Sequence, residues 1–304
     1  MQQKTMMLTF EIGLLIVPFL LHLFGIFILC RTAANNLGFT CKLFFVNLSL
    51  AEVTVCLFGI LKRCAGINKK ENLKYHATLL QYAIGYSLYY VVMILLTMDR
   101  FFRVYLNLKF HLYWPDWWNG KILMSFWIFS CALFATFEIF KVPINQLNKC
   151  FFPVYDVVFI VISIITYTYI FVKVKGNRKR LLKPQPSSAA EDDQGNDDDS
   201  KTFSIASNST DKNDNIQAEK RDILSNSKEF LSIFLLVITF QIFTVLPDFI
   251  YVYIELKYPG TDMSHKLSVI VLFMYGMGYT VDFFIYTFSS KAVRHTLFKM
   301  FQNG

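Results

Sequence analysis

The chain has 304 residues, of which 54% are hydrophobic and 17% aromatic, with a formal net charge of +8 and a mean hydropathy of +0.40. This composition excludes one ordinary soluble domain and indicates a protein whose solvent is lipid. A helix that crosses a bilayer needs about twenty mostly apolar residues, because hydrocarbon offers no water to its backbone groups.

Seven apolar blocks of about this length follow one another along the chain. They leave almost no soluble remainder in which seven buried helices could be enclosed. We therefore predict an all-α membrane protein, a seven-transmembrane helix bundle that forms one domain over residues 1–304. The predicted spans cover residues 7–30, 43–61, 75–98, 122–140, 154–172, 230–254 and 267–288.

An odd number of spans places the two chain ends on opposite sides of the membrane. With the N-terminus outside, 20 of the 30 Lys and Arg residues fall in cytoplasmic segments. Basic loops resist translocation, so this excess favours an extracellular N-terminus. The basic segment 62–74 opposes the rule locally.

Between the fifth and sixth blocks the composition changes to Pro, Ser, Asn, Asp and Lys over residues 173–228. We interpret this segment as a disordered third cytoplasmic loop. Its Ser and Thr residues are either kinase targets or plain linker residues. Its acidic run lacks the spacing of a calcium loop, and we expect no metal site there.

After the seventh block, residues 289–301 carry apolar side chains at helical spacing and basic residues on the remaining faces. The pattern is typical of a short interfacial C-terminal helix that lies on the inner leaflet.

Two cysteines, Cys64 and Cys150, fall on the predicted outer side of the membrane. A disulfide bond between them is plausible in that oxidising compartment, and two free thiols are the alternative.

Three charged residues fall within or at the end of predicted spans: Glu52, Arg100 and Asp282. Charges in lipid are costly, which favours a functional role with a defined partner. Arg100 as a plain marker of the lipid interface is the alternative for that residue.

The motifs around these charges resemble the rhodopsin-like (class A) G-protein-coupled receptor family. Asn47-Leu48-Ser49-Leu50-Ala51-Glu52 resembles the family's second-span pattern, and Asp99-Arg100-Phe101 resembles its Asp-Arg-Tyr motif. Trp127, Pro247 and Tyr286 also occur where the family has a Trp, a kink-forming Pro and a Tyr. Ordered matches at the correct depth in five spans are much stronger than any single tripeptide.

The resemblance implies a multi-pass receptor of the plasma membrane that binds an extracellular ligand and activates heterotrimeric G proteins. In the family picture the sixth helix moves outward about Pro247, and Arg100 leaves Asp99 to contact the G protein. Tyr286 and a fifth-span tyrosine, Tyr167 or Tyr169, would hold the extended arginine. Kinases and arrestin would act at the third cytoplasmic loop.

The same resemblance places Glu52 opposite Asp282 in the bundle interior. Two neighbouring carboxylates repel each other strongly at low dielectric. We therefore expect a sodium ion or a shared proton between them. A purely structural hydrogen-bonded pair is the alternative. No other cofactor is expected.

Several family positions are altered in this chain. Ile26 replaces the usual Asn of the first span, Phe283 the Pro of the seventh-span motif, and Val245 the usual Trp before the sixth-span Pro. The chain is therefore a divergent member of the pattern it resembles.

Candidate ligand-pocket residues lie in the outer halves of the spans: Tyr82, Tyr86, Glu138, Asp156 and Asp248. The three acids predict an acidic cup for a ligand such as a cationic peptide. The alternatives are acids at the water interface and tyrosines that serve helix packing.

A signalling receptor is thus the favoured function. A receptor-like binding protein that does not couple is the second hypothesis, and an ion-coupled transporter is a third, although no inverted repeat is present. No nucleophile–base constellation favours an enzyme, and we expect no nucleic-acid partner.

Overall fold

The computed structural model describes residues 2–32, 39–106, 113, 115–144, 152–181, 231–257 and 262–302. Within these ranges the regular elements are all helical, and seven of the helices are long and apolar enough to cross a membrane. The predicted fold class is therefore confirmed. The seven spans are Leu8–Arg31, Phe39–Ile67, Glu71–Leu106, Trp117–Ile139, Pro153–Lys173, Leu231–Ile254 and Leu267–Phe288.

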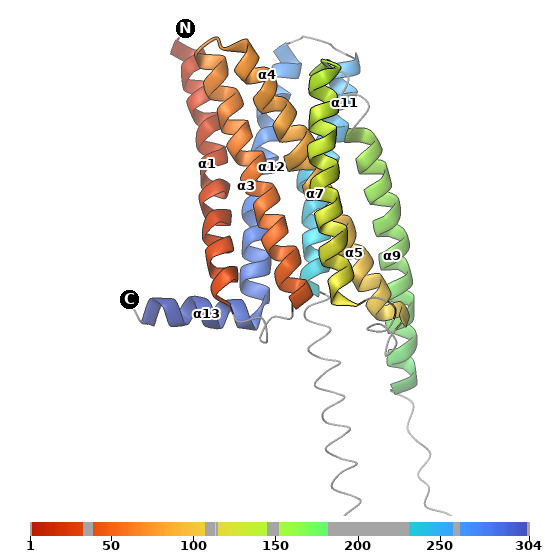
Figure 1. Ribbon diagram of the computed structural model, residues 1–304. Coiled ribbons are helices and arrows are strands. Elements are labelled where there is room, and N and C mark those ends of the chain that lie inside the picture. The colour runs from red at the N-terminus through yellow and green to blue at the C-terminus, as the bar shows by residue number, and fades with distance from the viewer. Residues whose placement is uncertain are drawn as a thin grey trace, which may run out of the picture.

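Successive helices run up and down in one bundle, and the two chain ends lie at opposite ends of it (Figure 1). We refer to these as the N-terminal end and the C-terminal end of the bundle. The elements are α1 (Gln2–Arg31), α3 (Phe39–Ile67), α4 (Glu71–Leu80), η1 (Gln81–Tyr86), α5 (Ser87–Leu106), α7 (Asp116–Ile139), α9 (Phe152–Leu181), η4 (Gln241–Val245), α11 (Leu246–Lys257), α12 (Asp262–Ser289) and α13 (Lys291–Gln302).

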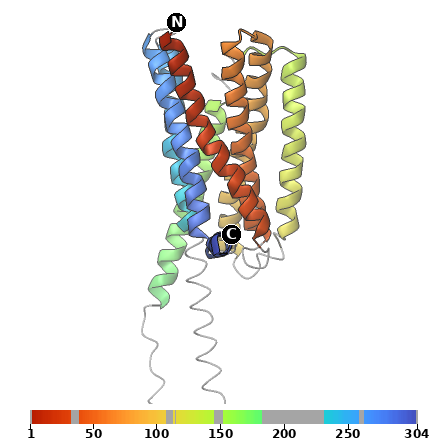
Figure 2. The same cartoon turned by 90° about the vertical axis from the view of Figure 1, so that its left-hand side faces the viewer.

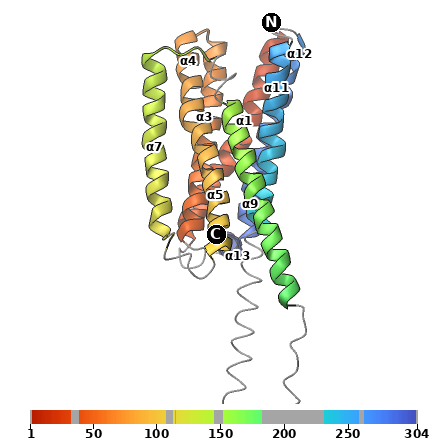
Figure 3. The same ribbon diagram turned by 90° about the vertical axis from the view of Figure 1, so that its right-hand side faces the viewer.

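The third span, formed by α4, η1 and α5, is the most enclosed of the seven, and α7 in the fourth span is the least enclosed. Seen from the side, α7 stands at one edge of the bundle, whereas α1 lies beside α12 (Figures 2 and 3). The third span therefore contributes to every polar site described below.

Large apolar side chains cover the outer surface of the bundle, as expected for helices that face hydrocarbon. Examples on the peripheral helices are Met124, Ile128 and Phe129 of α7 and Ile164 and Phe171 of α9, all exposed. In contrast, many of the buried side chains are polar. The polar side chains that could bind a ligand or an ion therefore lie in the interior of the bundle and not on its outer surface.

An aromatic cluster fills the middle of the core. Phe240 of the sixth span makes edge-on contacts with Tyr89, Tyr90 and Phe159, at ring-centre distances of 5.0, 5.1 and 4.7 Å. Edge-to-face pairs of this kind are favoured by the quadrupoles of the rings. The cluster joins the third, fifth and sixth spans at one residue.

Two spans contain a wide π-helical turn. One is η1 in the third span, and the other is η4, which ends two residues before Pro247. A proline removes one backbone donor and displaces the carbonyl of the preceding turn, which a wider turn accommodates. Close helix contacts accompany both turns, because Gly85 of η1 faces Val55 and Gly278 of α12 faces Phe243 of η4.

The structure differs from the sequence prediction mainly at helix ends. The helix α9 continues to Leu181, so the first nine residues of the predicted loop 173–228 are helical. Lys, Arg and Val are compatible with a helix outside lipid, and hydropathy alone does not detect such an extension. Residues 182–230 lie outside the described part of the chain.

The predicted interfacial segment forms α13, which runs across the C-terminal end of the bundle at a steep angle to the spans (Figure 1). Val293 is buried, and Leu297 also contacts the core. Phe298 and Phe301 are exposed, at 63% and 73%. The helix thus attaches to the bundle by one side and leaves aromatic rings free on another.

Candidate functional site

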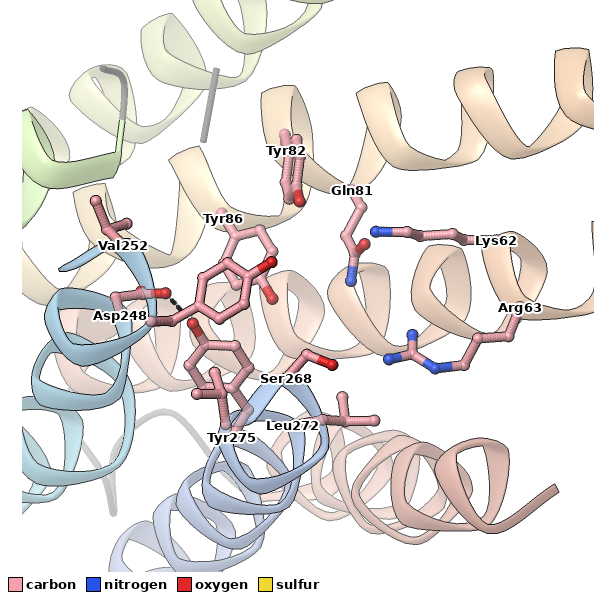
Figure 4. A pocket seen from close by; sticks show the side chains of 12 residues that line it. Lys62, Arg63, Gln81, Tyr82, Tyr86, Asp248, Val252, Ser268, Leu272 and Tyr275 are labelled. Atoms are coloured by element: carbon pink, nitrogen blue, oxygen red, sulfur yellow. Dashed lines mark hydrogen bonds between the residues drawn. The ribbon is translucent and has the colours of Figure 1, made fainter. Parts of the chain in front are cut away.

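A cavity of about 190 Å³ opens toward the N-terminal end of the bundle, between the second, third, sixth and seventh spans (Figure 4). Its lining combines two cations, one acid and several hydroxyl groups on an aromatic wall. The lining residues are Lys62, Arg63, Gln81, Tyr82, Tyr86, Asp248, Tyr251, Val252, Ser268, Val271, Leu272 and Tyr275.

The two charged ends of the cavity face each other across this aromatic wall (Figure 4). At one end Lys62 lies over the ring of Tyr82, with its Nζ 5.7 Å from the ring centre. Beside it, Nε of Arg63 donates to Oε2 of Glu11 at 2.8 Å. At the other end Asp248 accepts a hydrogen bond from the Tyr275 hydroxyl.

The predicted acids do not form one cup. Only Asp248 lines the cavity, together with the predicted Tyr82 and Tyr86. Asp156 is buried and accepts a hydrogen bond from Tyr90, so a hydroxyl of the third span satisfies it instead of a ligand.

Glu138 lies near the end of α7, away from the cavity lining. It lies within hydrogen-bonding distance of Nδ1 of His76, at 3.1 Å, and forms an ion pair with Lys141. The hydrogen bond to Glu138 raises the pKa of Lys141, which lies beyond the fourth span. Glu138 thus matches the alternative interpretation of an acid at the helix end better than that of a pocket residue.

A second polar site lies deep in the bundle, where the first, second, third and seventh spans meet. His22 and Glu52 are fully buried, with Nδ1 of the imidazole 2.6 Å from Oε2 of the carboxyl. The Tyr89 hydroxyl donates to Oδ2 of the buried Asp282 at 2.6 Å. We call His22, Glu52, Tyr89 and Asp282 the core polar cluster.

Proton positions in this cluster follow from its geometry. Nε2 of His22 lies 2.8 Å from the carbonyl oxygen of Tyr279, which only accepts, so this nitrogen carries a hydrogen. The 2.6 Å approach of Nδ1 to Glu52 then requires a proton between them. Glu52 is therefore protonated on a neutral imidazole, or His22 is a cation beside a carboxylate.

The carboxyl groups of Glu52 and Asp282 also lie within hydrogen-bonding reach of each other. Glu52 Oε1 and Asp282 Oδ1 are buried and have no hydrogen-bond donor among the described residues. Burying a carboxyl oxygen without a hydrogen-bond donor raises the free energy of the folded state. A proton or a small cation between the two groups would relieve this cost.

His22 was not identified from the sequence. It is the only His, Lys, Arg, Asp or Glu in the apolar block 12–30, and such a side chain at membrane depth indicates a functional or structural role. Its ring also contacts Tyr286, whose hydroxyl lies 3.2 Å from Nδ1 of His22 and accepts from Ser49 at 2.9 Å. Tyr286 therefore belongs to this region in the structure rather than to the surroundings of Arg100.

The Asp99–Arg100 pair lies at the C-terminal end of the third span, and both side chains are buried. Nε of Arg103 is 2.8 Å from Oδ2 of Asp99, whereas Nε of Arg100 is 3.8 Å from the same oxygen. Nη2 of Arg100 instead donates to Sγ of Cys41 on α3 at 3.1 Å. Asp99 is thus shared between two arginines, and Arg100 is held against the second span.

The neighbouring aromatic residues join the third and fifth spans. Phe101 contacts Tyr169 of α9, with ring centres 5.1 Å apart. Tyr167 contacts Phe234 of the sixth span at the same distance, and it lies within range of an electrostatic interaction with Arg100.

A side-chain hydrogen bond joins the fourth span to the second. Nε1 of Trp127 donates to Oδ1 of Asn47 at 3.1 Å. Cys64 is a free thiol, in contrast to the predicted disulfide bond, and Cys150 lies outside the described residues.

Comparison with known proteins adds no relatives: no family model and no curated protein matches the sequence.

Proposed function

We propose that the chain is a receptor of the plasma membrane, with its N-terminus outside the cell, which binds an extracellular ligand and activates heterotrimeric G proteins. The main support is one observation. A polar, aromatic-walled cavity at one end of the bundle is joined through the third and sixth spans to a buried Asp99–Arg100 pair at the other end. This arrangement suits the transfer of a signal across a membrane.

The motif residues support the proposal by their positions. Asn47 and Trp127 contact each other, Pro247 follows a π-helical turn, and Arg100 lies six residues before the end of the long third span. These features agree with the resemblance to rhodopsin-like receptors at five spans. The altered residues, such as Phe283, agree with a divergent member.

A ligand in the cavity would contact the third span through Tyr82 and Tyr86 and the sixth through Asp248. It would thereby change the contact between the third and sixth spans. These two spans also pack against each other in the middle of the core, where Phe240 contacts Tyr89 and Tyr90. The sixth span would pivot at η4 and Pro247, where one backbone hydrogen bond is already missing. Its lower half would then move away from the third span.

This motion would free Arg100. In the structure the guanidinium donates to a sulfur acceptor, and its Nε lies 3.8 Å from Oδ2 of Asp99, which is longer than the contacts of a close bidentate pair. An equilibrium of this kind can be shifted by a ligand with a differential affinity of a few kcal/mol. The exposed arginine would then bind the G protein, and kinases and arrestin would act on the third cytoplasmic loop, residues 173–228, of which 182–228 lie outside the described residues.

The proposal is tested without knowing the ligand. The Asp99→Asn chain, reconstituted in lipid with a panel of purified heterotrimeric G proteins, should accelerate nucleotide exchange severalfold over wild type, because it removes the carboxylate that Arg103 binds and that lies 3.8 Å from Nε of Arg100. Adding Arg100→Ala to this background should return exchange to the level of empty bilayers. Lys121→Ala, which removes an exposed cation at the same end of the bundle, is the matched control and should change little.

If no member of the panel responds to the Asp99→Asn chain, G-protein coupling is wrong. A receptor-like binding protein would then be the better description. An ion flux through the same reconstituted chain would instead favour the transporter hypothesis.

A further inference from the structure

The cavity at the N-terminal end of the bundle has a chemical polarity that defines a class of ligand. We infer that it binds a small organic acid, whose anionic group contacts Lys62 and whose hydroxyl or other hydrogen-bond donor contacts Asp248. The inference rests on the proposed function, in which this cavity takes the extracellular ligand, and it differs from the cationic peptide predicted from the sequence.

Lys62 provides the first reason. Its charge points into the cavity (Figure 4), yet among the described residues it has neither a hydrogen bond nor an ion pair, only the ring of Tyr82 at 5.7 Å. The nearby acid Glu11 is already occupied by Arg63 at 2.8 Å. A half-buried ammonium without an anion is costly, and a ligand anion would remove that cost.

The surroundings of Lys62 strengthen this requirement. Arg63 and Lys74 both lie within electrostatic range, so the local field is positive and one carboxylate, Glu11, offsets it only in part. A positive field inside a low-dielectric wall attracts anions and repels amines. The cationic end of the cavity therefore selects against a ligand with an ammonium at this position.

Asp248 provides the second reason. Its Oδ1 accepts from Tyr275, and no other hydrogen bond to this carboxyl occurs in the described part of the chain. A carboxylate has two oxygens and about four acceptor positions, so capacity remains for a ligand donor. A ligand hydroxyl or amide fits here without any charge on the ligand.

The wall between the two ends is aromatic. Tyr82 and Tyr86 line one side, with ring centres 5.8 Å apart, and Tyr275 lines the other, 6.3 Å from Tyr86. A dry cavity of about 150 Å³ accepts benzene, so a cavity of about 190 Å³ admits a small aromatic acid or the end group of a larger one. Stacking on tyrosine would hold a flat ring between the charged ends.

A matched set of probes tests the inference. We would measure binding of 4-hydroxyphenylacetate, its neutral amide 4-hydroxyphenylacetamide, the cation tyramine, and phenylacetate to the purified full chain by ligand-observed NMR at millimolar concentration. The set is extended to 3-(4-hydroxyphenyl)propionate, because the separation of the two ends sets the optimal chain length. At least one hydroxyaryl acid should bind, with about tenfold preference over its amide, and tyramine should not compete.

Variants connect this preference to the two residues. Lys62→Gln should weaken binding of the acid about tenfold and abolish the preference over the amide, whereas Lys62→Arg should retain it. Lys69→Gln removes an exposed cation at the same end of the bundle and should change nothing. Asp248→Asn should reduce the advantage of 4-hydroxyphenylacetate over phenylacetate.

The inference is overturned if no acid of the set binds the wild-type chain, if amides or tyramine bind as well as acids, or if Lys62→Gln leaves the preference intact. These binding measurements involve no G protein. Acid binding without G-protein activation by any variant would overturn the proposed function alone, and activation by the Asp99→Asn chain without acid binding would overturn the inference alone.

Discussion

Nδ1 of His22 in the first span lies 2.6 Å from Oε2 of Glu52 in the second span, a separation from which we infer a proton between the two atoms. The other ring nitrogen is fixed by the carbonyl of Tyr279, 257 positions away in the sequence. One imidazole therefore joins three helices, and its environment leads to the first two predictions.

Glu52→Gln should have a small effect on stability, because the amide can still donate to Nδ1 of His22. His22→Leu should cost about 2 kcal/mol or more, since it leaves a buried carboxyl without its partner. Thermal unfolding of the purified chain in detergent measures both. Equal melting temperatures for the two variants would contradict the shared proton.

The pair Glu52 and Asp282 should make the chain sensitive to sodium. We expect a higher melting temperature in sodium chloride than in N-methylglucamine chloride at equal ionic strength, because a small cation can occupy the space between the unpaired oxygens. Asp282→Asn should remove the difference. If wild type shows no sodium effect, a proton alone occupies this space.

Cys41→Ala should raise ligand-independent G-protein activation about two- to fivefold, because Arg100 loses the acceptor that holds it against the second span. The control is Cys56→Ala, a buried thiol of the same helix that does not contact Arg100. Nucleotide exchange in reconstituted bilayers gives the comparison. An equal response of the two variants would show that the sulfur contact does not restrain Arg100.

Pro247→Ala should reduce exchange in the Asp99→Asn background severalfold, because alanine restores the missing backbone donor and stiffens the pivot. The chain contains its own control, Pro18, which lies inside α1 away from the sixth span. Pro18→Ala should leave exchange unchanged. Full activity of the Pro247→Ala chain would remove the pivot from the mechanism.

Gly278→Ala should destabilise the chain by about 1–3 kcal/mol, because a Cβ there would lie 2.8 Å from Cβ of Phe243. Gly13→Ala is the matched control, since nothing lies within 4 Å of its added Cβ. The control should be neutral or slightly stabilising, because alanine is the better helix former. Melting temperatures of the two variants decide the point.

The number and order of the spans could be predicted from the sequence because hydrocarbon thickness sets a length that apolar blocks must match. Helix ends could not, because a helix such as α9 continues beyond lipid in residues that hydropathy classifies as loop. The third span also extends several residues beyond its predicted ends at both sides.

The candidate site was only partly predictable. Tyr82, Tyr86 and Asp248 line the cavity, but Asp156 and Glu138 are satisfied by Tyr90 and Lys141, which depends on which side chains happen to meet across helices. Lys62 belongs to the basic segment 62–74 of the sequence, and only its position in three dimensions shows that it faces the cavity without an anion among the described residues. The role of His22 depends on Glu52 and Tyr279, which come from other helices and meet it only in the folded bundle.

The helix α1 packs against both α3 and α12, so the first helix covers one side of the carboxyl groups of Glu52 and Asp282, with His22 in contact with Glu52. A shortened chain that began after Arg31 would lack this covering helix, and the carboxyl groups of Glu52 and Asp282 would face the acyl chains of the lipid. We expect such a product to misfold and to be degraded, and not to form a smaller functional bundle.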